Sequence, residues 1–371
     1  MPPTSQPHRK REVKRTNYVG IDVGKNRCAV CVADEKGEIL RKLIYMNTRG
    51  GIEELAENLS RYGKCRAVLE STGNLWLKTY EILEAHSVPV KLANPLQTKA
   101  IAQARIKTDK LSARILTHLL RASLIPECYI PPKETRERRS LLRYRSELVK
   151  DRTRIRNEVH SLLDKYDLRC EYKDLFCVGG MRWLEEVELP SEDQAILESQ
   201  IRRLRGLQRE VEAVDSRIAS KASMDEEVRL LMTMTGVSHY GALLIASEIG
   251  DVTRFQSPEK LVSWAGLCPS LHQSGESTHY CKIKRGGNKH VRWLMVEAAK
   301  SASSHDPEMR TLYERTRRRH GSQNAVIRVA NKMLRVVWYM LTRREPYRQG
   351  KEVLYKNKLM RMEKLASSRL A

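Results

Sequence analysis

The sequence predicts an α/β domain followed by mainly helical domains. Three observations lead to this fold class. Residues 17–125 alternate short apolar runs with amphipathic stretches, two later segments repeat an aliphatic residue every seven positions, and a helix–turn–helix pattern follows Met224. Because a chain of 371 residues is long for a single hydrophobic core, two or three domains are expected.

The first domain, residues 17–125, has the pattern of a mixed sheet with helices. Strand-like and helix-like stretches follow one another in the order β-β-β-α-β-α-β-α. Strands are expected within residues 17–34 (two strands around a glycine turn), 38–48, 65–72 and 88–95, and helices within 50–63, 74–87 and 96–124, with one break near Thr108. This order indicates an α/β domain with a mixed sheet.

Residues 126–133 are expected to be a linker, because the segment IPECYIPPK holds three prolines. Two long amphipathic helices are then predicted within residues 134–222. Their heptad positions are Leu141, Leu148, Ile155 and Leu162 in the first helix, and Leu197, Leu204, Leu207, Val211, Val214 and Ile218 in the second. Heptad spacing predicts a helical hairpin, a coiled-coil dimerisation arm, or both. A helical bundle within the chain is the alternative, and the dense charges beside a narrow seam favour the arm.

Residues 223–345 are expected to form a third, mainly helical domain. The stretch LLMTMTGVSHYGALLIASEIG resembles a helix-hairpin-helix motif. Its residues Gly236, Ser238 and Gly241 would present backbone N–H groups to a DNA phosphate. Ser238 stands where a second glycine is usual, so a tight turn without a ligand is the alternative. Residues 346–371 form a basic tail, expected either as a helix that touches nucleic acid or as a frayed end.

The charge balance points to a polyanionic partner. The chain has 68 basic and 45 acidic side chains, a formal charge of +23 and a pI near 9.8. Such an excess favours nucleic acid over a membrane surface, and no run of about 18 apolar residues suggests a span. Residues 1–16 are basic without a following apolar stretch, which predicts a disordered basic arm rather than a secretory signal. We therefore expect a cytoplasmic, nucleoid-associated prokaryotic protein.

The eight cysteines predict no zinc site. Cys28 and Cys31 form a CxxC, but they lie in a strand pattern, where residues three apart point to opposite faces. No second pair stands at zinc-ligand spacing. Reduced, structural cysteines are therefore expected.

Three acids follow or begin predicted elements of the first domain. Asp22 and Glu70 end strands, and Asp109 starts a helix after the next strand. Acids so placed can converge on one edge of a sheet and bind Mg²⁺, or Mn²⁺, through oxygen ligands. Two-metal phosphoryl chemistry needs such an arrangement. A solvated carboxylate is the alternative for any one of them, and Asp109 alone would be a good helix N-cap.

A second group of polar residues lies in the C-terminal third. Ser274 stands in a QSGE turn, and the basic residues that follow could hold a phosphate near its hydroxyl. These residues are Lys282, Lys284, Arg285, Asn288, Lys289 and Arg292. A serine before glycine is a poor nucleophile unless a base or a metal deprotonates it. On these grounds alone, Ser274 fits a turn residue better than a nucleophile.

The motifs YVGIDVGKN, VLESTGN, RIKTDKLSA, GLCPS, QSGE and IKRGGNKHVR, in this order, resemble the DEDD transposases of the IS one-ten insertion-sequence family. The resemblance covers roughly residues 17–345. It implies a RuvC-like N-terminal domain of RNase H type, a coiled-coil segment and a C-terminal domain with a catalytic serine. Asp22, Glu70 and Asp109 would be the first three acids of DEDD, and Ser274 the nucleophile that forms a phosphoserine link to DNA. The resemblance also implies a structured guide RNA (a bridge RNA) and a dimer or tetramer in which acids of one subunit face the serine of another.

One position departs from this family. The family pattern KTDxxDA places an acid where this chain has Ser112. Because Mg²⁺ tolerates water ligands, three carboxylates can still hold it, with Ser112 acting directly or through a water. Our hypothesis is a working but weaker metal site. An element copy that has lost activity is the rival explanation.

Three other functions compete with this one. A RuvC-like structure-specific nuclease would use the same acids with water as the nucleophile. A sugar kinase could share the GIDVGKN stretch, but it needs a second glycine-rich phosphate loop and an adenosine loop, and neither occurs. A non-catalytic DNA- or RNA-binding scaffold would tolerate loss of Asp22.

Overall fold

The computed structural model describes residues 16–70, 73–102, 109–274, 277–283 and 286–368, and the side chains of these residues except 102–110 and 269–283. The expected basic arm and the break near Thr108 therefore lie outside the described residues, apart from Thr16, which begins the first strand. Chain contacts divide the protein into a first unit that ends at Ile130 and a second that begins at Pro131. Each unit is described by itself.

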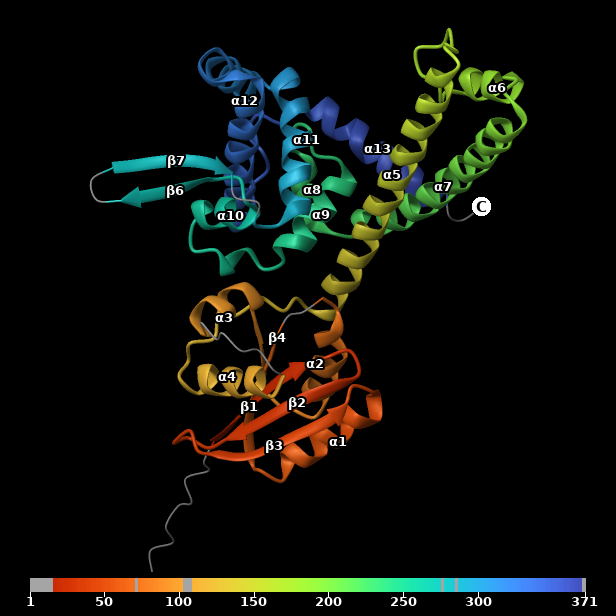
Figure 1. The fold of residues 1–371 in the computed structure, drawn as a ribbon. Coiled ribbons are helices and arrows are strands. Elements are labelled where there is room, and N and C mark those ends of the chain that lie inside the picture. Colours follow the sequence, from red (N-terminus) through yellow and green to blue (C-terminus); the bar gives the residue numbers. More distant parts are fainter. Residues whose placement is uncertain (1–15, 71–72, 103–108, 275–276, 284–285, 369–371) are drawn as a thin grey trace, which may run out of the picture. The chain divides into compact units, whose positions relative to one another are not determined.

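The first unit contains one five-stranded sheet with helices on both faces (Figure 1). The strand order is β3-β2-β1-β4-β5; β1 pairs antiparallel with β2 and parallel with β4. Its elements are β1 (Thr16–Val23), β2 (Arg27–Ala33), β3 (Ile39–Met46), α1 (Arg49–Ser60), β4 (Lys64–Glu70), α2 (Leu75–Ala85), β5 (Val90–Ala93), α3 (Pro95–Ala102) and α4 (Asp109–Arg121). The predicted fold class, an RNase H-like mixed sheet before a mainly helical part, is confirmed.

Alternation along the strands supplies a core on each side of this sheet. Ile21 and Leu69 face α1 and α2, where they meet residues such as Leu55. Val68 faces the other way and packs against Leu116 of α4. Because side chains alternate along a strand, Gly20 and the residues two positions away from it also lie on the α4 face.

The CxxC residues belong to different cores, as predicted. Cys28 lies in the core with α1 and α2, and Cys31 packs with Ala113 of α4. Both thiols are free, and burial is the main reason why the pKa of Cys28 rises to about 11. A pair on opposite faces cannot hold one metal ion together, so these cysteines fill space in the sheet.

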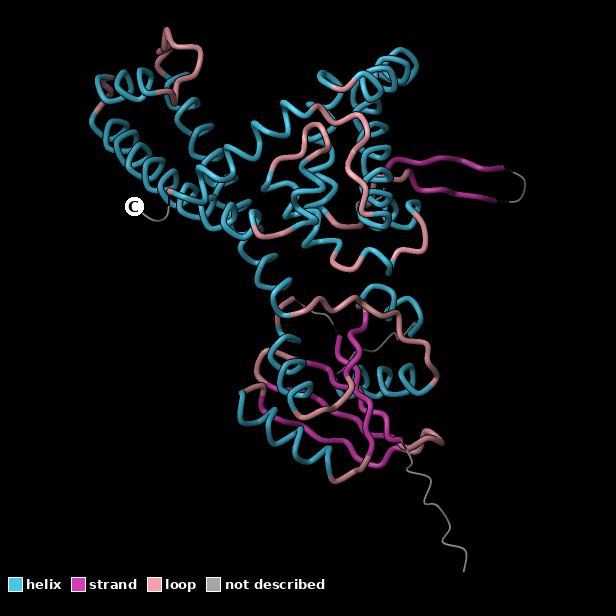
Figure 2. Tube along the Cα trace, turned by 180° about the vertical axis from the view of Figure 1, so that it is seen from behind, coloured by secondary structure: helices cyan, strands magenta, loops and turns pink. Residues whose placement is uncertain are grey.

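The second unit is mainly helical, with one β-hairpin that extends from the helices (Figure 2). Its elements are α5 (Lys133–Lys165), α6 (Val178–Glu186), α7 (Ser191–Ser223), α8 (Glu226–Met232), α9 (His239–Ile249), a short 3-10 turn (Val252–Arg254), α10 (Pro258–Ala265), β6 (Pro269–Ser274), β7 (Ser277–Ile283), α11 (Lys289–His305), α12 (Pro307–Arg343) and α13 (Glu352–Ser367). None of the helices in the described residues is both long and apolar enough to cross a membrane.

Helices α5 and α7 form a hairpin within the chain, joined through α6 (Figure 1). Ile155 of α5 and Leu197 and Leu204 of α7 are buried in one cluster under α6. Toward the other end, Leu148, Val211 and Ile218 enter the larger core around α9. Among the alternatives that the heptad spacing left open, the helical hairpin within the chain is therefore present. The heptad residues pack between its two helices.

Helix α9 occupies the centre of the C-terminal core. All its residues from His239 to Ile249 are buried, and α5, α7, α8, α11 and α13 contact it. The tail that follows α12 is part of this core as well. Its helix α13 packs against α7, Met362 is fully buried, and Lys358 Nζ donates hydrogen bonds to the Met232 and Met234 carbonyls at 2.8 and 2.7 Å.

Candidate functional site

The parallel pairing of β1 with β4 places Asp22 beside Glu70. Ile21 is in register with Leu69, so the next residue of each strand stands at the same edge of the sheet. Both side chains are half-buried. Asp22 lies two positions after Gly20, and Glu70 two positions after Val68, so both carboxylates are on the face that α4 covers.

Helix α4 runs across this face with its first turn toward the two acids. A Cβ on Gly20 would come within 2.1 Å of the Ala113 carbonyl oxygen, so the helix backbone lies directly on β1 there. At the other end of α4, Arg121 donates to the Glu35 carbonyl at 3.3 Å, beyond the end of β2. The turn before Ala113, which begins at Asp109 and contains the half-buried Ser112, therefore lies toward the edge of Asp22 and Glu70.

The chemistry of these donors fits a hard divalent cation. Carboxylate and hydroxyl oxygens are the ligands that Mg²⁺ and Mn²⁺ accept. Among the residues whose side chains are described, no group of three His, Cys, Asp or Glu gathers, and the Asp109 side chain is outside that set. Asp22 and Glu70 thus supply two oxygen donors at one edge, with the start of α4 beside them.

Ser274 is the last residue of β6 in the second unit. It pairs with Ser277 of β7, across the turn residues 275–276 that lie outside the described residues. Lys282 lies in β7, and Lys284 and Arg285 fall outside the described residues. The sequence indicated a turn here and not the flanking strands. The hairpin places Ser274 at the end of a two-stranded ribbon.

The ribbon returns to the helical core through a tight glycine turn. Gly287 has φ +89°, and a Cβ there would lie 2.7 Å from the Gly266 backbone nitrogen. Asn288 donates its backbone N–H to the Trp264 carbonyl at 3.0 Å, and Arg292 donates to the Gly286 carbonyl at 2.6 Å. The predicted residues Asn288 and Arg292 therefore hold the chain where β7 leads into α11.

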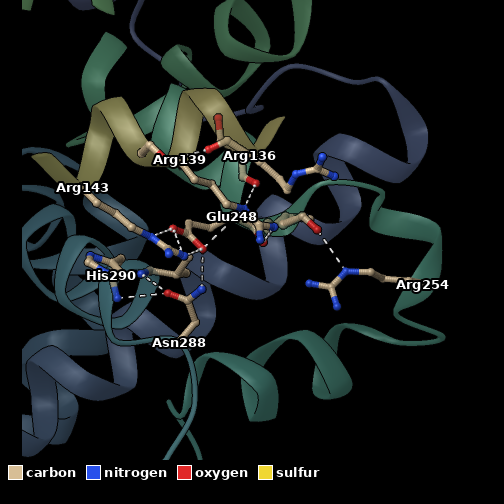
Figure 3. Close-up of polar contacts among 11 residues, drawn as sticks. Arg136, Arg139, Arg143, Glu248, Arg254, Asn288 and His290 are labelled. Carbon is tan, nitrogen blue, oxygen red and sulfur yellow. Dashed lines mark hydrogen bonds and ion pairs between the residues drawn. The ribbon is translucent and has the colours of Figure 1, made fainter. Parts of the chain in front are cut away.

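A buried acid, Glu248, anchors this turn (Figure 3). Its side chain on α9 is 1% exposed. It accepts a bidentate pair of bonds from Arg143 of α5 at 2.9 and 3.0 Å, and a third bond from Asn288 Nδ2 at 2.8 Å. Asn288 Oδ1 in turn accepts the backbone N–H groups of His290 and Val291 and so caps α11. One carboxylate thus ties α5, α9 and α11 together.

The end of α9 is closed by arginines from two elements. Arg139 donates to the Ser247 and Glu248 carbonyls at 2.8 and 2.9 Å, and Arg254 donates to the Ile249 carbonyl at 3.0 Å (Figure 3). Cations there satisfy the last carbonyls and complement the helix dipole. Neither Glu248 nor its arginines were predicted from the sequence. The only available signal was a lone acid inside the apolar stretch ALLIASEI.

A groove between α5 and α11 borders this anchor. It has a volume of about 830 Å³ and is lined by residues that include Lys150, Lys289 and Trp293. Trp293 is 47% exposed. At His290, which also lines the groove, burial and then the nearby Arg143 charge lower the pKa, so the ring is neutral over a wider pH range. Cationic walls beside an exposed indole suit phosphates and stacked bases.

The glycines of the helix-hairpin-helix-like motif pack against α11. A Cβ on Gly236 (φ +83°) would lie 2.5 Å from the Ala298 carbonyl oxygen, and one on Gly241 would lie 3.2 Å from Leu294 Cδ1. Ser238 accepts the Gly241 N–H at 3.3 Å and caps α9. These contacts explain the small residues by packing, and their contact with DNA stays a prediction.

An RNase H-like sheet with two adjacent acids, followed by a basic helical unit, is typical of enzymes that act on nucleic acids. Comparison with known families makes this class specific. A family model described as Transposase matches residues 19–167, and a second, described as Transposase IS116/IS110/IS902 family, matches residues 228–314. The chain belongs to the IS110 family of transposases, enzymes that cleave DNA and transfer its strands.

Curated relatives agree along most of the chain. The transposase for insertion sequence element IS1111A of Coxiella burnetii is 27% identical over 92% of this chain and 94% of the relative. The pilin gene-inverting protein of Moraxella bovis is 24% identical over 89% and 97%. A probable family 20 transposase of Pseudomonas aeruginosa is 26% identical over 77% and 86%.

Proposed function

We propose that this transposase cuts and rejoins the ends of an insertion sequence through a covalent link between Ser274 and a DNA phosphate. Asp22, Glu70 and Asp109 would hold a divalent metal ion for this reaction, and a structured RNA would guide it to its target. The observation that carries the proposal is the placement of Asp22 and Glu70 side by side, on the sheet face where α4 begins.

The position of Ser274 supports its role as nucleophile. It ends a strand of an extended ribbon, and the ribbon is held by the turn that Glu248 anchors. In the proposed step, the Ser274 oxygen bonds to phosphorus while a phosphorus–deoxyribose oxygen bond breaks. The serine gives up its proton, and the departing deoxyribose oxygen takes one up. A DNA strand end then displaces the serine by the reverse exchange, so no bond energy is lost.

In this proposal the acids of the first unit would hold the metal ion. When bound, a divalent ion would stabilise negative charge on the phosphate oxygens and make a hydroxyl easier to deprotonate. Ser112, on the same helix face as Asp109, would complete the donor set directly or through water. The positive end of α4 would favour the anionic groups of this proposed site.

A covalent-adduct assay tests the serine chemistry. Protein, Mg²⁺, element-end DNA and the RNA transcribed beside the gene are mixed, and a denaturing gel is examined for DNA that migrates with protein. The adduct should form with the wild type and with Ser277→Ala, the matched change across the hairpin. It should disappear in Ser274→Ala, which still binds DNA. Free cut ends without an adduct would instead assign the water-dependent nuclease.

The RNA guide and the oligomer have separate tests. Omitting the RNA should abolish joining to the target while leaving DNA binding, and unchanged joining would remove the guide from the proposal. If acids of one subunit act with the serine of another, mixing inactive Asp22→Ala with inactive Ser274→Ala should restore part of the joining. A mixture that stays inactive would indicate that each chain uses its own residues.

A further inference from the structure

A second cationic groove lies along the hairpin of α5 and α7, next to α6, and it shares no lining residue with the groove beside the Glu248 anchor. It lies between α5, α6 and α7 and has a volume of about 820 Å³. Five arginines from these three helices line it: Arg152, Arg156, Arg182, Arg205 and Arg209. Glu185 is the one acidic residue in its lining, all of which is described. The groove therefore carries an excess of positive charge within a single folded unit.

The arginines are only partly neutralised by the protein. Arg205 contacts Glu185, and Arg152 donates to Gln208 at 2.7 Å. Within the described part of the chain, Arg182 and Arg209 have no ion pair or hydrogen bond. Burial and the neighbouring Arg156 and Arg145 charges lower the pKa of Arg152. Like charges held this close raise the free energy of the protein until an anion joins them.

Part of the lining of the groove is apolar and aromatic. Phe176, Met181 and Leu204 line it, and the Arg156 guanidinium lies 4.6 Å from the centre of the Phe176 ring. The Nε atom of Arg156 is buried without a hydrogen-bond partner in the described structure. A groove lined by both guanidinium groups and apolar side chains accepts unstacked bases and the phosphates between them. In a duplex the bases are stacked inside the helix, so they could not contact the apolar residues of this groove.

We propose that this groove, formed by the five arginines and Phe176, binds an unpaired nucleic-acid strand. The proposal rests on the function proposed above only in that the protein handles nucleic acid. The proposed site lies on the helical hairpin of α5 and α7, and it includes neither the three acids nor Ser274. The net charge of +23 favours a nucleic acid over an acidic protein segment as the occupant.

The test is fluorescence anisotropy of labelled oligouridylate, oligothymidylate and duplex DNA across a series of salt concentrations, without metal. The groove variant is Arg182→Gln/Arg209→Gln. The matched control is Arg169→Gln/Arg203→Gln, which removes two exposed arginines of the hairpin region that do not line the groove. Single-strand affinity of the groove variant should fall roughly tenfold. Its salt dependence should weaken by about 1.4 in the logarithmic slope, because two phosphates lose their partners.

Several outcomes decide the proposal. Because repulsion is relieved, the thermal midpoint of the groove variant should be unchanged or higher, whereas arginines that serve the fold would lower it. Equal losses in the groove and control variants would overturn the proposal. So would a change of oligomeric state without a change in strand affinity, which would mark the groove as a protein interface. Since no strand joining is measured, a failure of the serine chemistry would leave this result intact.

Discussion

Glu248 Oε2 accepts a hydrogen bond from Asn288 Nδ2 at 2.8 Å, and the two residues lie 40 positions apart in the chain. The bond joins the buried end of α9 to the start of α11, where the Ser274 ribbon returns to the core. The carboxylate therefore positions the start of α11 through Asn288, next to the point where the ribbon enters the helical core.

Glu248→Gln should destabilise the second unit by about 2–4 kcal/mol, because the charged partner of Arg143 is removed from a buried site. Asn288→Ala should cost about 1–2 kcal/mol through the lost cap of α11. Urea unfolding measures both changes. Glu297→Gln is the control, because its ion pair with Lys300 is exposed on the same helix and is worth less than about 1 kcal/mol.

Strand joining by Asn288→Ala should fall further than this loss of stability explains, when it is assayed at a temperature where the variant is folded. The reason is that the β7–α11 connection loses its fixed position. Full joining by folded Asn288→Ala would show that the ribbon finds its place without the Glu248 anchor.

Ser112→Asp should lower the Mg²⁺ concentration needed for half-maximal DNA cleavage by roughly tenfold, because one more carboxylate joins the site. The new acid would also lie in the first turn of α4, where the helix dipole stabilises it by about 0.3–1 kcal/mol. In Ser112→Asn the new side chain is about as large as aspartate but carries no charge, so the Mg²⁺ requirement should stay near that of the wild type. An identical Mg²⁺ requirement in the Asp variant would refute the weaker-site hypothesis. Cleavage by the Asp variant alone would mean that Ser112 had silenced this copy.

Gly20→Ala should destabilise the first unit by about 1–3 kcal/mol, because the new methyl group collides with the Ala113 carbonyl and pushes α4 off the sheet. The shift would also carry the first turn of α4 away from Asp22, so cleavage should decrease. Hydrogen exchange in β1 and α4 measures the loosening directly. Gly50→Ala is the matched control: nothing lies within 4 Å of its added Cβ, and alanine in a helix should stabilise by about 0.5–1 kcal/mol.

Because Lys358 is partly buried, we expect the docking of α13 to depend on pH. Burial lowers the pKa of its ammonium group from 10.5 to about 8. Between these values the unfolded chain holds a proton that the folded chain lacks, so the contribution of Lys358 to stability rises with pH. Urea midpoints of the wild type should therefore rise relative to those of Lys358→Met across this window. A constant difference between the two proteins would mean that the amine keeps its ordinary pKa.

Much of the first unit could be predicted because its signals are local. Alternating apolar residues in β1 and helical spacing in α1 each reflect a single face turned to one core. The placement of Asp22 and Glu70 at the ends of neighbouring strands follows from the same pattern. The position of α4 near that edge depends on Gly20, because the absence of a side chain there lets the helix backbone lie against β1. A single glycine in the sequence does not show which helix will pack on it.

The second unit depends more on distant contacts. The strands β6 and β7 were not predicted, because residues such as His272, Gln273 and Thr278 interrupt any apolar alternation. Glu248 was missed because its partner Arg143 lies 105 residues away and looked like one more charge beside a heptad seam. The sequence pattern records which side chains are apolar, and it does not record which charges are paired in the interior.

The docking of α13 on α7 has a consequence for synthesis. Ile218 and Ala222 near the end of α7 share a core with Met362, which emerges from the ribosome much later. At ordinary rates of elongation that interval is on the order of ten seconds. During this interval the hairpin of α5 and α7 can form, because its contacts are between nearby segments. The apolar side of α7 stays exposed until α13 is made and packs on it. A chain interrupted before Glu352 would keep this surface open, and chaperones or proteases would recognise it.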